Sequence, residues 1–511
     1  MTTIDGEDAA AIAGATHVEP PDHAPLARQT FAYGLSGLIV PLVGLVSLPI
    51  FARVFTRSEY GILELGTSMT TVALALTDAG LTAAALRSFY DYRSDEEPER
   101  RSVMLTGFVA TTALALVLAA AMILFRGQIA HWVFGRSGDE VLVVLIAASV
   151  PALNALRFVS EVMRVRFQAF HYLAVTLIVA VVTTGLIVIG LLALGWRVKG
   201  VFLAILVGNL IAAVYGILIV RGSLAGRFSG PKLRQMLAYG LPLVPAALAA
   251  WALALIDRII LSRLGSLAQV GQYAIANRLA SLLIVALTAF LLALTPFLLS
   301  TYSEDPAQER AARARTLTYL TFILSLAGLV LTLFAKEIVE VVAPSFGDAY
   351  KAVGPLMLGS IGYGIVSLLT TGIAIARKTG IQALLAVIAA GINIGLNFVL
   401  IPPFGIVGAA LATTVGYAFL AFSYYWASQR VYPTPYEPAK VLTTLGLASV
   451  LGAVGVIPLS PLGVAIAVKL LAIALFIAGI RLTGTMTGAE FAELRRFVRG
   501  MVPLRLIRAR A

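Results

Sequence analysis

The sequence has no cysteine among its 511 residues, which excludes disulfides, thiolate metal sites and a cysteine nucleophile. Its four histidines lack the spacing of metal ligands, so neither a metal nor another cofactor is expected. Charge is also scarce, because only 13% of the residues are charged. A soluble domain carries roughly a quarter. The sequence therefore leaves little room for a soluble domain.

Hydrophobic residues make up 59% of the chain and are gathered into long runs. Runs of about 20 apolar residues cross the ~30 Å hydrocarbon core as helices. The sequence thus predicts an all-α polytopic membrane protein with about fourteen transmembrane helices, at 29–54, 59–88, 102–125, 141–166, 172–195, 199–221, 238–262, 267–300, 314–335, 350–376, 379–401, 405–428, 440–459 and 461–482.

Basic residues are distributed unevenly between the two sides of this arrangement. With the N-terminus inside, the inner segments hold 25 of the 38 lysines and arginines, and the outer segments hold 10. Cytoplasmic loops retain basic residues, so both termini are predicted to be cytoplasmic. The net charge of +12 then lies along the inner face, where anionic membrane lipid attracts it. We therefore expect no nucleic-acid partner.

The two halves of the chain resemble each other. Residues 32–35 and 238–241 both read Ala-Tyr-Gly-Leu, and six small or apolar residues between 200 and 213 recur between 408 and 421. Such a repeat is typical of transporters built from parallel halves. It predicts a disordered cytoplasmic tail (1–28), an N-lobe of helices 1–6 (29–222), an inter-lobe linker (223–237), a C-lobe of helices 7–12 (238–430), helices 13–14 (431–483) and a basic amphipathic tail on the inner surface (484–511).

Prolines occur in the first helix of both halves. Pro41 and Pro49 lie in helix 1, and Pro242 and Pro245 lie in helix 7. Proline removes a backbone hydrogen bond and bends a helix, which suits an element that flexes during alternating access. Ordinary tolerance of proline in membrane helices explains the same pattern.

Three stretches carry a resemblance to a known family. The most specific is 396–413, in which an asparagine is followed by Ile-Pro and then by Gly-Ile-Val-Gly-Ala-Ala. The second combines Asp257 and Arg258 with residues 264–273, and the third covers 78–90. Together they resemble the polysaccharide, or lipid-linked oligosaccharide, flippases of the multidrug/oligosaccharidyl-lipid/polysaccharide exporter superfamily.

The resemblance implies a V-shaped exporter fold of two six-helix lobes with two further C-terminal helices. It also implies a place in the bacterial inner membrane and export of an undecaprenyl-pyrophosphate-linked oligosaccharide repeat unit to the periplasmic leaflet, for lipopolysaccharide or exopolysaccharide biosynthesis. A polymerase and a ligase of the same pathway are the expected protein partners.

Ionisable residues within the predicted spans are candidate site residues, because charge inside a membrane is costly. Arg278 lies well inside helix 8 and could hold a pyrophosphate through two parallel hydrogen bonds. The alternative is a structural ion pair with Glu64, which the internal repeat places opposite Asn277. Arg157 is one helical turn from Glu161 and could bind the headgroup or pair with that carboxylate.

Four further charges have more than one interpretation. Asp257 and Arg258 are either an outward gate or an interfacial anchor. Arg258 is also a candidate for headgroup binding, and Glu64 is a further candidate for coupling or gating. Asp78 could carry a coupling proton or cation, or form a helix-packing hydrogen bond. Lys469 could meet a phosphate at a groove for the polyprenyl tail, or it could snorkel or pair with a carboxylate.

Three other functions compete with this one. A lipid II flippase differs from the preferred function only in cargo. A cation-coupled multidrug antiporter is expected to carry an essential carboxylate on an early helix of a lobe. Helix 1 has none from Phe31 to Phe51, but Asp78 in helix 2 keeps this alternative open. A membrane polymerase or glycosyltransferase needs paired catalytic groups on a large outer loop. The largest predicted outer loop, 126–140, contains Asp139 and Glu140 but no such group of catalytic residues. The sequence therefore predicts a transporter and not an enzyme.

Overall fold

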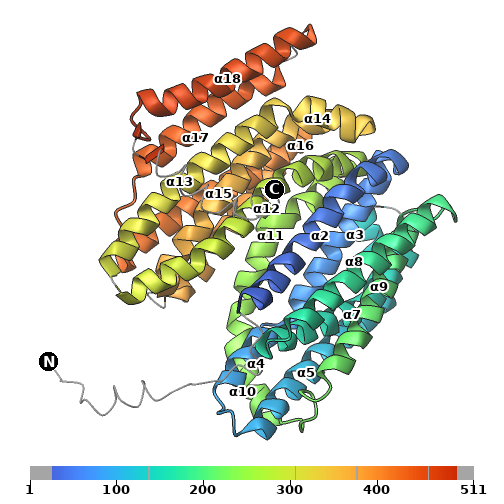
Figure 1. Cartoon of the computed structure of the whole chain (residues 1–511). Helices are drawn as coiled ribbons and strands as arrows, with labels where there is room; N and C mark the ends of the chain where they lie inside the picture. Colours follow the sequence, from blue (N-terminus) through green and yellow to red (C-terminus); the bar gives the residue numbers. More distant parts are fainter. Residues whose placement is uncertain are drawn as a thin grey trace, which may run out of the picture.

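The computed structural model describes residues 26–491, apart from 136–137, 305, 376–377, 458–459 and 489. Most of the two tails predicted at 1–28 and 484–511 lies outside the described residues. All regular structure in the described part is helical, and Figure 1 shows it as two bundles with a helical hairpin on one of them.

The N-lobe contains α2 (Leu26–Val54), α3 (Arg57–Asp78), α4 (Leu81–Tyr90), α5 (Glu97–Leu124), α6 (Arg126–Phe134), α7 (Glu140–Val165), α8 (Ala169–Leu192) and α9 (Val198–Val220). The connection to the C-lobe is made by α10 (Gly230–Gly240) and η1 (Leu241–Leu243). The C-lobe contains α11 (Val244–Leu264), α12 (Leu267–Glu304), α13 (Pro306–Leu333), α14 (Ala335–Val342), η2 (Pro344–Ala349), α15 (Tyr350–Ile375) and α16 (Thr379–Val431). The hairpin consists of α17 (Pro438–Gly452), η3 (Ala453–Val456) and α18 (Leu462–Leu482).

The helices confirm a multi-pass membrane protein. Within the described residues, 11 helical segments are long and apolar enough to cross a membrane, and the bent pair α3 and α4 makes a twelfth. Helix α16 reverses at Gly405, whose φ of 54° is left-handed, so it contains both of the spans predicted at 379–401 and 405–428. With α2 over the first predicted span, the architecture is consistent with the predicted fourteen.

The two lobes meet at one end and diverge towards the other, as in the predicted V shape (Figure 1). Helices α3, α7 and α9 begin at the closed end. Under the topology predicted from the basic residues this end faces the periplasm, and we call it the outer end. The hairpin α17–α18 packs on α13, on the side of the C-lobe away from the N-lobe.

Two helices break where the lobes are joined. The second span bends by 42° between α3 and α4, where Ala79 and Gly80 adopt positive φ. The seventh span breaks at η1, and a Cβ on Gly80 would lie 2.6 Å from the Gly240 carbonyl oxygen beside that break. Helix α10 packs on α4 and α5, whereas α11 packs on α16. The prolines of helix 1 behave differently, because α2 remains helical through positions 41 and 49.

Candidate functional site

The outer contact between the lobes is a crossing of α3 and α12 at two glycines. A Cβ on Gly61 would overlap the carbonyl group of Leu267, and a Cβ on Gly271 would overlap that of Arg57. Beside the crossing, the Tyr60 ring packs edge-on against Phe346 of η2, with ring centroids 5.5 Å apart. The backbones approach so closely because neither helix carries a side chain at the crossing. This contact closes the outer end.

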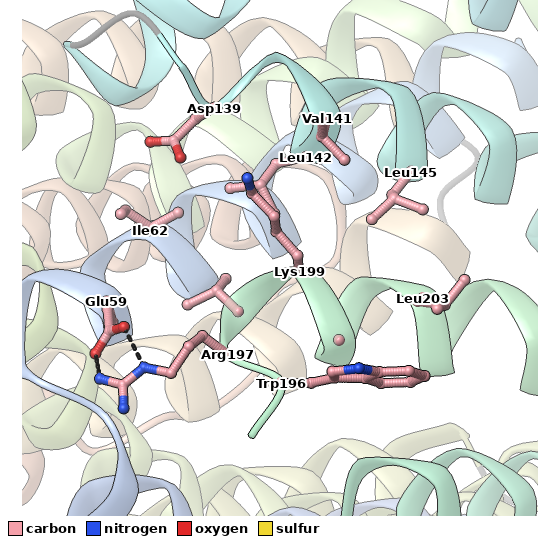
Figure 2. A pocket seen from close by; sticks show the side chains of 12 residues that line it. Glu59, Ile62, Asp139, Val141, Leu142, Leu145, Trp196, Arg197, Lys199 and Leu203 are labelled. Carbon is pink, nitrogen blue, oxygen red and sulfur yellow. Dashed lines mark hydrogen bonds and ion pairs between the residues drawn. The ribbon is translucent and has the colours of Figure 1, made fainter. Parts of the chain in front are cut away.

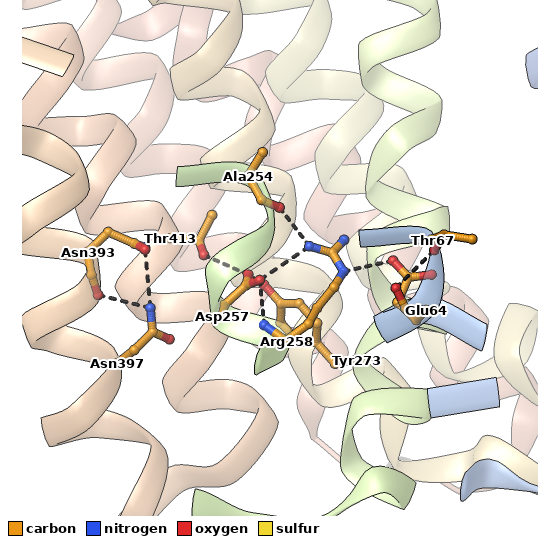
Figure 3. A network of polar contacts seen from close by, with 9 residues as sticks. All are labelled: Glu64, Thr67, Ala254, Asp257, Arg258, Tyr273, Asn393, Asn397 and Thr413. Atoms are coloured by element: carbon orange, nitrogen blue, oxygen red, sulfur yellow. Dashed lines mark hydrogen bonds and ion pairs between the residues drawn. The ribbon is translucent and has the colours of Figure 1, made fainter. Parts of the chain in front are cut away.

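An ion pair joins the lobes beneath this crossing. Nε of Arg258, on α11, donates to Oε1 of Glu64, on α3, over 2.7 Å (Figure 3). The Arg258 side chain is 2% exposed, and its Nη1 also donates to the Ala254 carbonyl oxygen at 2.6 Å. Sequence reasoning offered Glu64 as a partner of Arg278, but the carboxylate hydrogen-bonds Arg258 instead. Arg258 is thus a buried interlobe residue and not an interfacial anchor.

Asp257 holds this arginine from the C-lobe side. Its Oδ1 accepts from the Arg258 backbone N–H at 2.8 Å and from Nη1 of Arg258 at 3.2 Å. Its Oδ2 accepts from the hydroxyl groups of Tyr273 and Thr413, the latter at 3.2 Å. Burying a charge is tolerable only when it is paired and hydrogen-bonded, and this cluster meets both conditions.

Arg278 projects from α12 into the space between the lobes and is exposed. A Cβ on Gly44 of α2 would lie 3.6 Å from its Nη1 atom. Its guanidinium also acts electrostatically on Glu64 and on the hydroxyl of Tyr60, both on α3. Arg278 is therefore a cation of the C-lobe that faces two N-lobe helices just inside the closed end.

Arg157 is also exposed and forms no ion pair with any residue that the structure describes. The predicted pair with Glu161 is wrong, because Glu161 accepts from Nη1 of Arg164 at 2.9 Å. Both spacings lie on one helical face, so the sequence could not decide between them. Arg157 keeps a free guanidinium on α7.

The remaining candidates lie apart from the interlobe space. Lys469 on α18 pairs with Glu337 on α14 at 2.5 Å, which agrees with the carboxylate alternative. Asp78 accepts a hydrogen bond from the Thr82 hydroxyl, across the bend between α3 and α4. That contact agrees with the helix-packing alternative for Asp78.

Sequence reasoning missed a buried cluster at the other end of the C-lobe. Arg313 and Glu309 pair one turn apart on α13, and both side chains are almost fully buried. The hydroxyl of Tyr432 donates to Oε2 of Glu309 at 2.8 Å. The Glu-x-x-x-Arg spacing was the available signal, but these residues lay between the predicted spans 8 and 9.

Oxygen and nitrogen ligands for a metal are sparse in the described residues. They contain no group of three or more histidine or acidic side chains that could hold a metal ion.

Asn393 and Asn397, on α16, form a buried pair (Figure 3). The Nδ2 atom of Asn393 and the Oδ1 atom of Asn397 have no partner among the described residues.

The sequence of the N-lobe and the first part of the C-lobe matches a known protein family. Residues 26–301 match the family described as polysaccharide biosynthesis protein. No protein of curated function matches the sequence significantly.

Solved structures show the same fold at low sequence identity. One is a lipid II flippase, MurJ, in an inward closed conformation, with 14% identity and a TM-score of 0.70 over 88% of this chain and 98% of that chain. Another is an inward-facing multidrug resistance transporter of the MATE family, with 16% identity and a TM-score of 0.59 over 76% of this chain and 98% of that one. A third is a MOP superfamily transporter from Pyrococcus furiosus, with 16% identity and a TM-score of 0.57 over 79% and 95% of the two chains.

Proposed function

The chain belongs to the polysaccharide biosynthesis protein family, and from this premise we propose that it is a lipid-linked sugar flippase. Its cargo would be an undecaprenyl-pyrophosphate-linked oligosaccharide repeat unit, carried from the cytoplasmic to the periplasmic leaflet of the bacterial inner membrane. Both termini would be cytoplasmic. The repeat unit would then pass to a polymerase and a ligase of the same pathway.

The observation that carries the proposal is the exposed guanidinium of Arg278 between the lobes. A pyrophosphate carries several negative charges, and a guanidinium binds phosphate through paired charge-assisted hydrogen bonds. Arg157 offers a second exposed cation from the N-lobe. Two arginines on opposite lobes suit a cargo that is released when the lobes move relative to each other.

The Glu64–Arg258 pair supports alternating access. It joins the lobes only where the outer end is closed, so it must break before the cargo can leave on that side. Asp257 would keep Arg258 paired within the C-lobe when Glu64 withdraws. Glu64 and Asp257 would thus act in gating, and Arg258 would be the gate residue rather than a headgroup ligand.

Asp78 is assigned to coupling in this proposal. It lies at the bend beside the Gly80–Gly240 contact, so protonation or cation binding there could alter the bend. Lys469 is assigned a tethering role and not a phosphate contact, because Glu337 neutralises it.

The test is a deletion strain pulsed with labelled sugar. We expect the undecaprenyl-pyrophosphate oligosaccharide to accumulate on the cytoplasmic leaflet. The wild-type chain should relieve the accumulation, and Arg278→Ala should not. Lys336→Ala is the matched control, because Lys336 pairs with Glu340 on α14, outside the interlobe space.

Two results would replace this function by another. Accumulation of the peptidoglycan precursor lipid II, with normal oligosaccharide intermediates, would identify a lipid II flippase. Normal intermediates together with new sensitivity to cationic drugs would identify a cation-coupled multidrug antiporter.

A further inference from the structure

A groove of about 680 Å³ lies at the outer end of the N-lobe, away from the interlobe site. It lies between the first turns of α7 and α9 and is closed on a third side by α3. Figure 2 shows apolar side chains along one part of it and charged side chains at its rim. The apolar part is formed by Ile62, Val141, Leu142, Leu145, Val198 and Leu203.

The apolar part runs along the helices towards the membrane interior. Val141 and Leu145 are one turn apart on α7, and Val198 and Leu203 descend α9 in the same direction. Val141 is 50% exposed, so part of this surface is open. A groove that is charged at the membrane surface and apolar below it has the polarity of a lipid molecule.

The charged rim combines two carboxylates, Glu59 and Asp139, with two cations, Arg197 and Lys199. Lys199 extends across the groove between α9 and α7 in Figure 2, and it forms no ion pair with any residue in the described part of the chain. The other rim arginine is neutralised, because Nε of Arg197 donates to Oε1 of Glu59 at 2.6 Å. Because Arg197 is paired with Glu59, Lys199 is the cation of the described rim that is free to bind an anion.

The helix ends at the rim contribute less than this lysine. The N-cap residues of α7 and α9, Asp139 and Arg197, make no side-chain cap hydrogen bond. The first N–H groups of a helix have no partner within it, and the helix dipole there favours negative charge. The Leu142 and Gly200 amides already bond to the Asp139 and Arg197 carbonyl oxygens, so Lys199 supplies the main attraction for an anion at the rim of this apolar groove.

We propose that this groove binds an anionic glycerophospholipid from the adjacent leaflet, which is the outer leaflet under the predicted topology. The lipid phosphate would contact Lys199 at the start of α9, and an acyl chain would lie along Val141, Leu145 and Leu203. A soluble sugar phosphate fits the rim but would leave the apolar part in contact with water. Trp196, packed against Gly190 and Gly200, would border the bound lipid.

The position of the groove connects it to the outer contact between the lobes. Ile62 lines the groove and follows Gly61, which crosses α12. Glu59, at the rim, also forms the capping box that begins α3. A lipid in the groove would therefore contact the segment of α3 that closes the outer end. The binding itself does not depend on the cargo.

Fluorescence quenching in reconstituted bilayers tests the proposal. The chain has four tryptophans, and replacing Trp132, Trp251 and Trp426 by phenylalanine leaves Trp196 as the reporter. The probes are brominated phosphatidylglycerol and brominated phosphatidylcholine, titrated into phosphatidylcholine vesicles. We expect phosphatidylglycerol to quench Trp196 to saturation at a mole fraction several-fold lower than phosphatidylcholine.

Two variants of this reporter protein decide the site. Lys199→Ala should reduce the preference for phosphatidylglycerol about fivefold, the effect of one lysine at an anionic surface. Val141→Phe should reduce quenching by both lipids, because it fills the groove from an exposed position. Lys336→Ala, at the outer end of the C-lobe, should change neither.

Equal quenching curves for the two lipids, unaltered by Lys199→Ala, would show ordinary boundary lipid and overturn the proposal. Relief of quenching by millimolar inorganic phosphate or glycerol phosphate would assign the rim to a soluble anion, and would also overturn it.

Discussion

Glu64 of the N-lobe and Arg258 of the C-lobe share a 2.7 Å hydrogen bond between two side chains that are at most 10% exposed. In such surroundings removing one partner of an ion pair is strongly destabilising, whereas a neutral hydrogen-bonding replacement is milder. Under the proposed gating role, the pair would contribute to the free-energy difference between the closed and open forms of the outer end.

Glu64→Gln should shift the protein towards an outward-open form. The amide can still accept from Arg258, which keeps its pair with Asp257, so the change weakens the lobe contact without leaving an unpaired buried charge. A loss of about 1.5 kcal/mol corresponds to roughly a tenfold shift in population. The chain has no cysteine, so a single introduced cysteine can be labelled selectively. Ser68→Cys lies one helical turn after Glu64 on α3, and its reaction with an impermeant maleimide added from outside reports whether the outer end is open.

Labelling at position 68 should then be about tenfold faster in Glu64→Gln than in the parent. Glu309→Gln is the matched control, because that buried carboxylate pairs with Arg313 inside one lobe. Equal rates in the parent and in Glu64→Gln would show that the pair has no gating role.

The glycine crossing should tolerate no side chain. Gly61→Ala would place a methyl group against the Leu267 carbonyl group and separate α3 from α12 at the closed end. Gly185→Ala, on α8, meets no atom within 4 Å and should gain the roughly 0.5–1 kcal/mol that alanine gains over glycine in a helix. Thermal unfolding in detergent and maleimide labelling at position 68 measure both effects. A normal melting temperature and slow labelling for Gly61→Ala would contradict the structural role of the crossing.

Lys469 and Glu337 should behave as a structural pair between the hairpin and the C-lobe. Lys469→Met leaves the Glu337 carboxylate without its partner and should lower the free energy of unfolding by about 2 kcal/mol, less than for a fully buried pair because Glu337 keeps some solvent access. The double variant Lys469→Met/Glu337→Leu should recover most of that loss. Transport by the double variant distinguishes the two roles, since a phosphate-binding lysine could not be replaced in this way.

The segment after α18 should detach at acid pH. Burial alone would raise the pKa of Glu490, but hydrogen bonds from Thr487 and the ammonium of Lys440 outweigh it and lower that pKa. Because folding lowers this pKa, the contact is fully stabilised at pH values above the ordinary glutamate pKa of about 4.3. The stabilisation is lost as the pH falls through the lowered pKa. A spin label at Gly488→Cys should become mobile below pH 4. Glu490→Gln should be equally mobile at pH 4 and at pH 7.

Local patterns were sufficient to locate apolar helices that are long enough to cross a membrane. The predicted span at 461–482 matches α18 almost residue for residue, because apolar length alone decides whether a segment crosses the membrane. The bend between α3 and α4 was not predicted from the run 59–88, because it depends on the positive φ of Ala79 and on the contact of Gly80 with Gly240. Hydropathy carries no information about either.

Partner choice among the membrane charges was decided by the tertiary structure. The sequence identified Glu64, Arg258, Arg278 and Lys469 as candidates, because a charge in an apolar run is conspicuous at any position. It did not indicate that Glu64 hydrogen-bonds Arg258 or that Glu337 meets Lys469, residues 132 positions apart. Whether a residue lies in the membrane depends on its neighbours along the chain, so the sequence determined it. Which charges meet depends on the rotation and crossing of helices distant in the chain, and packing alone sets these.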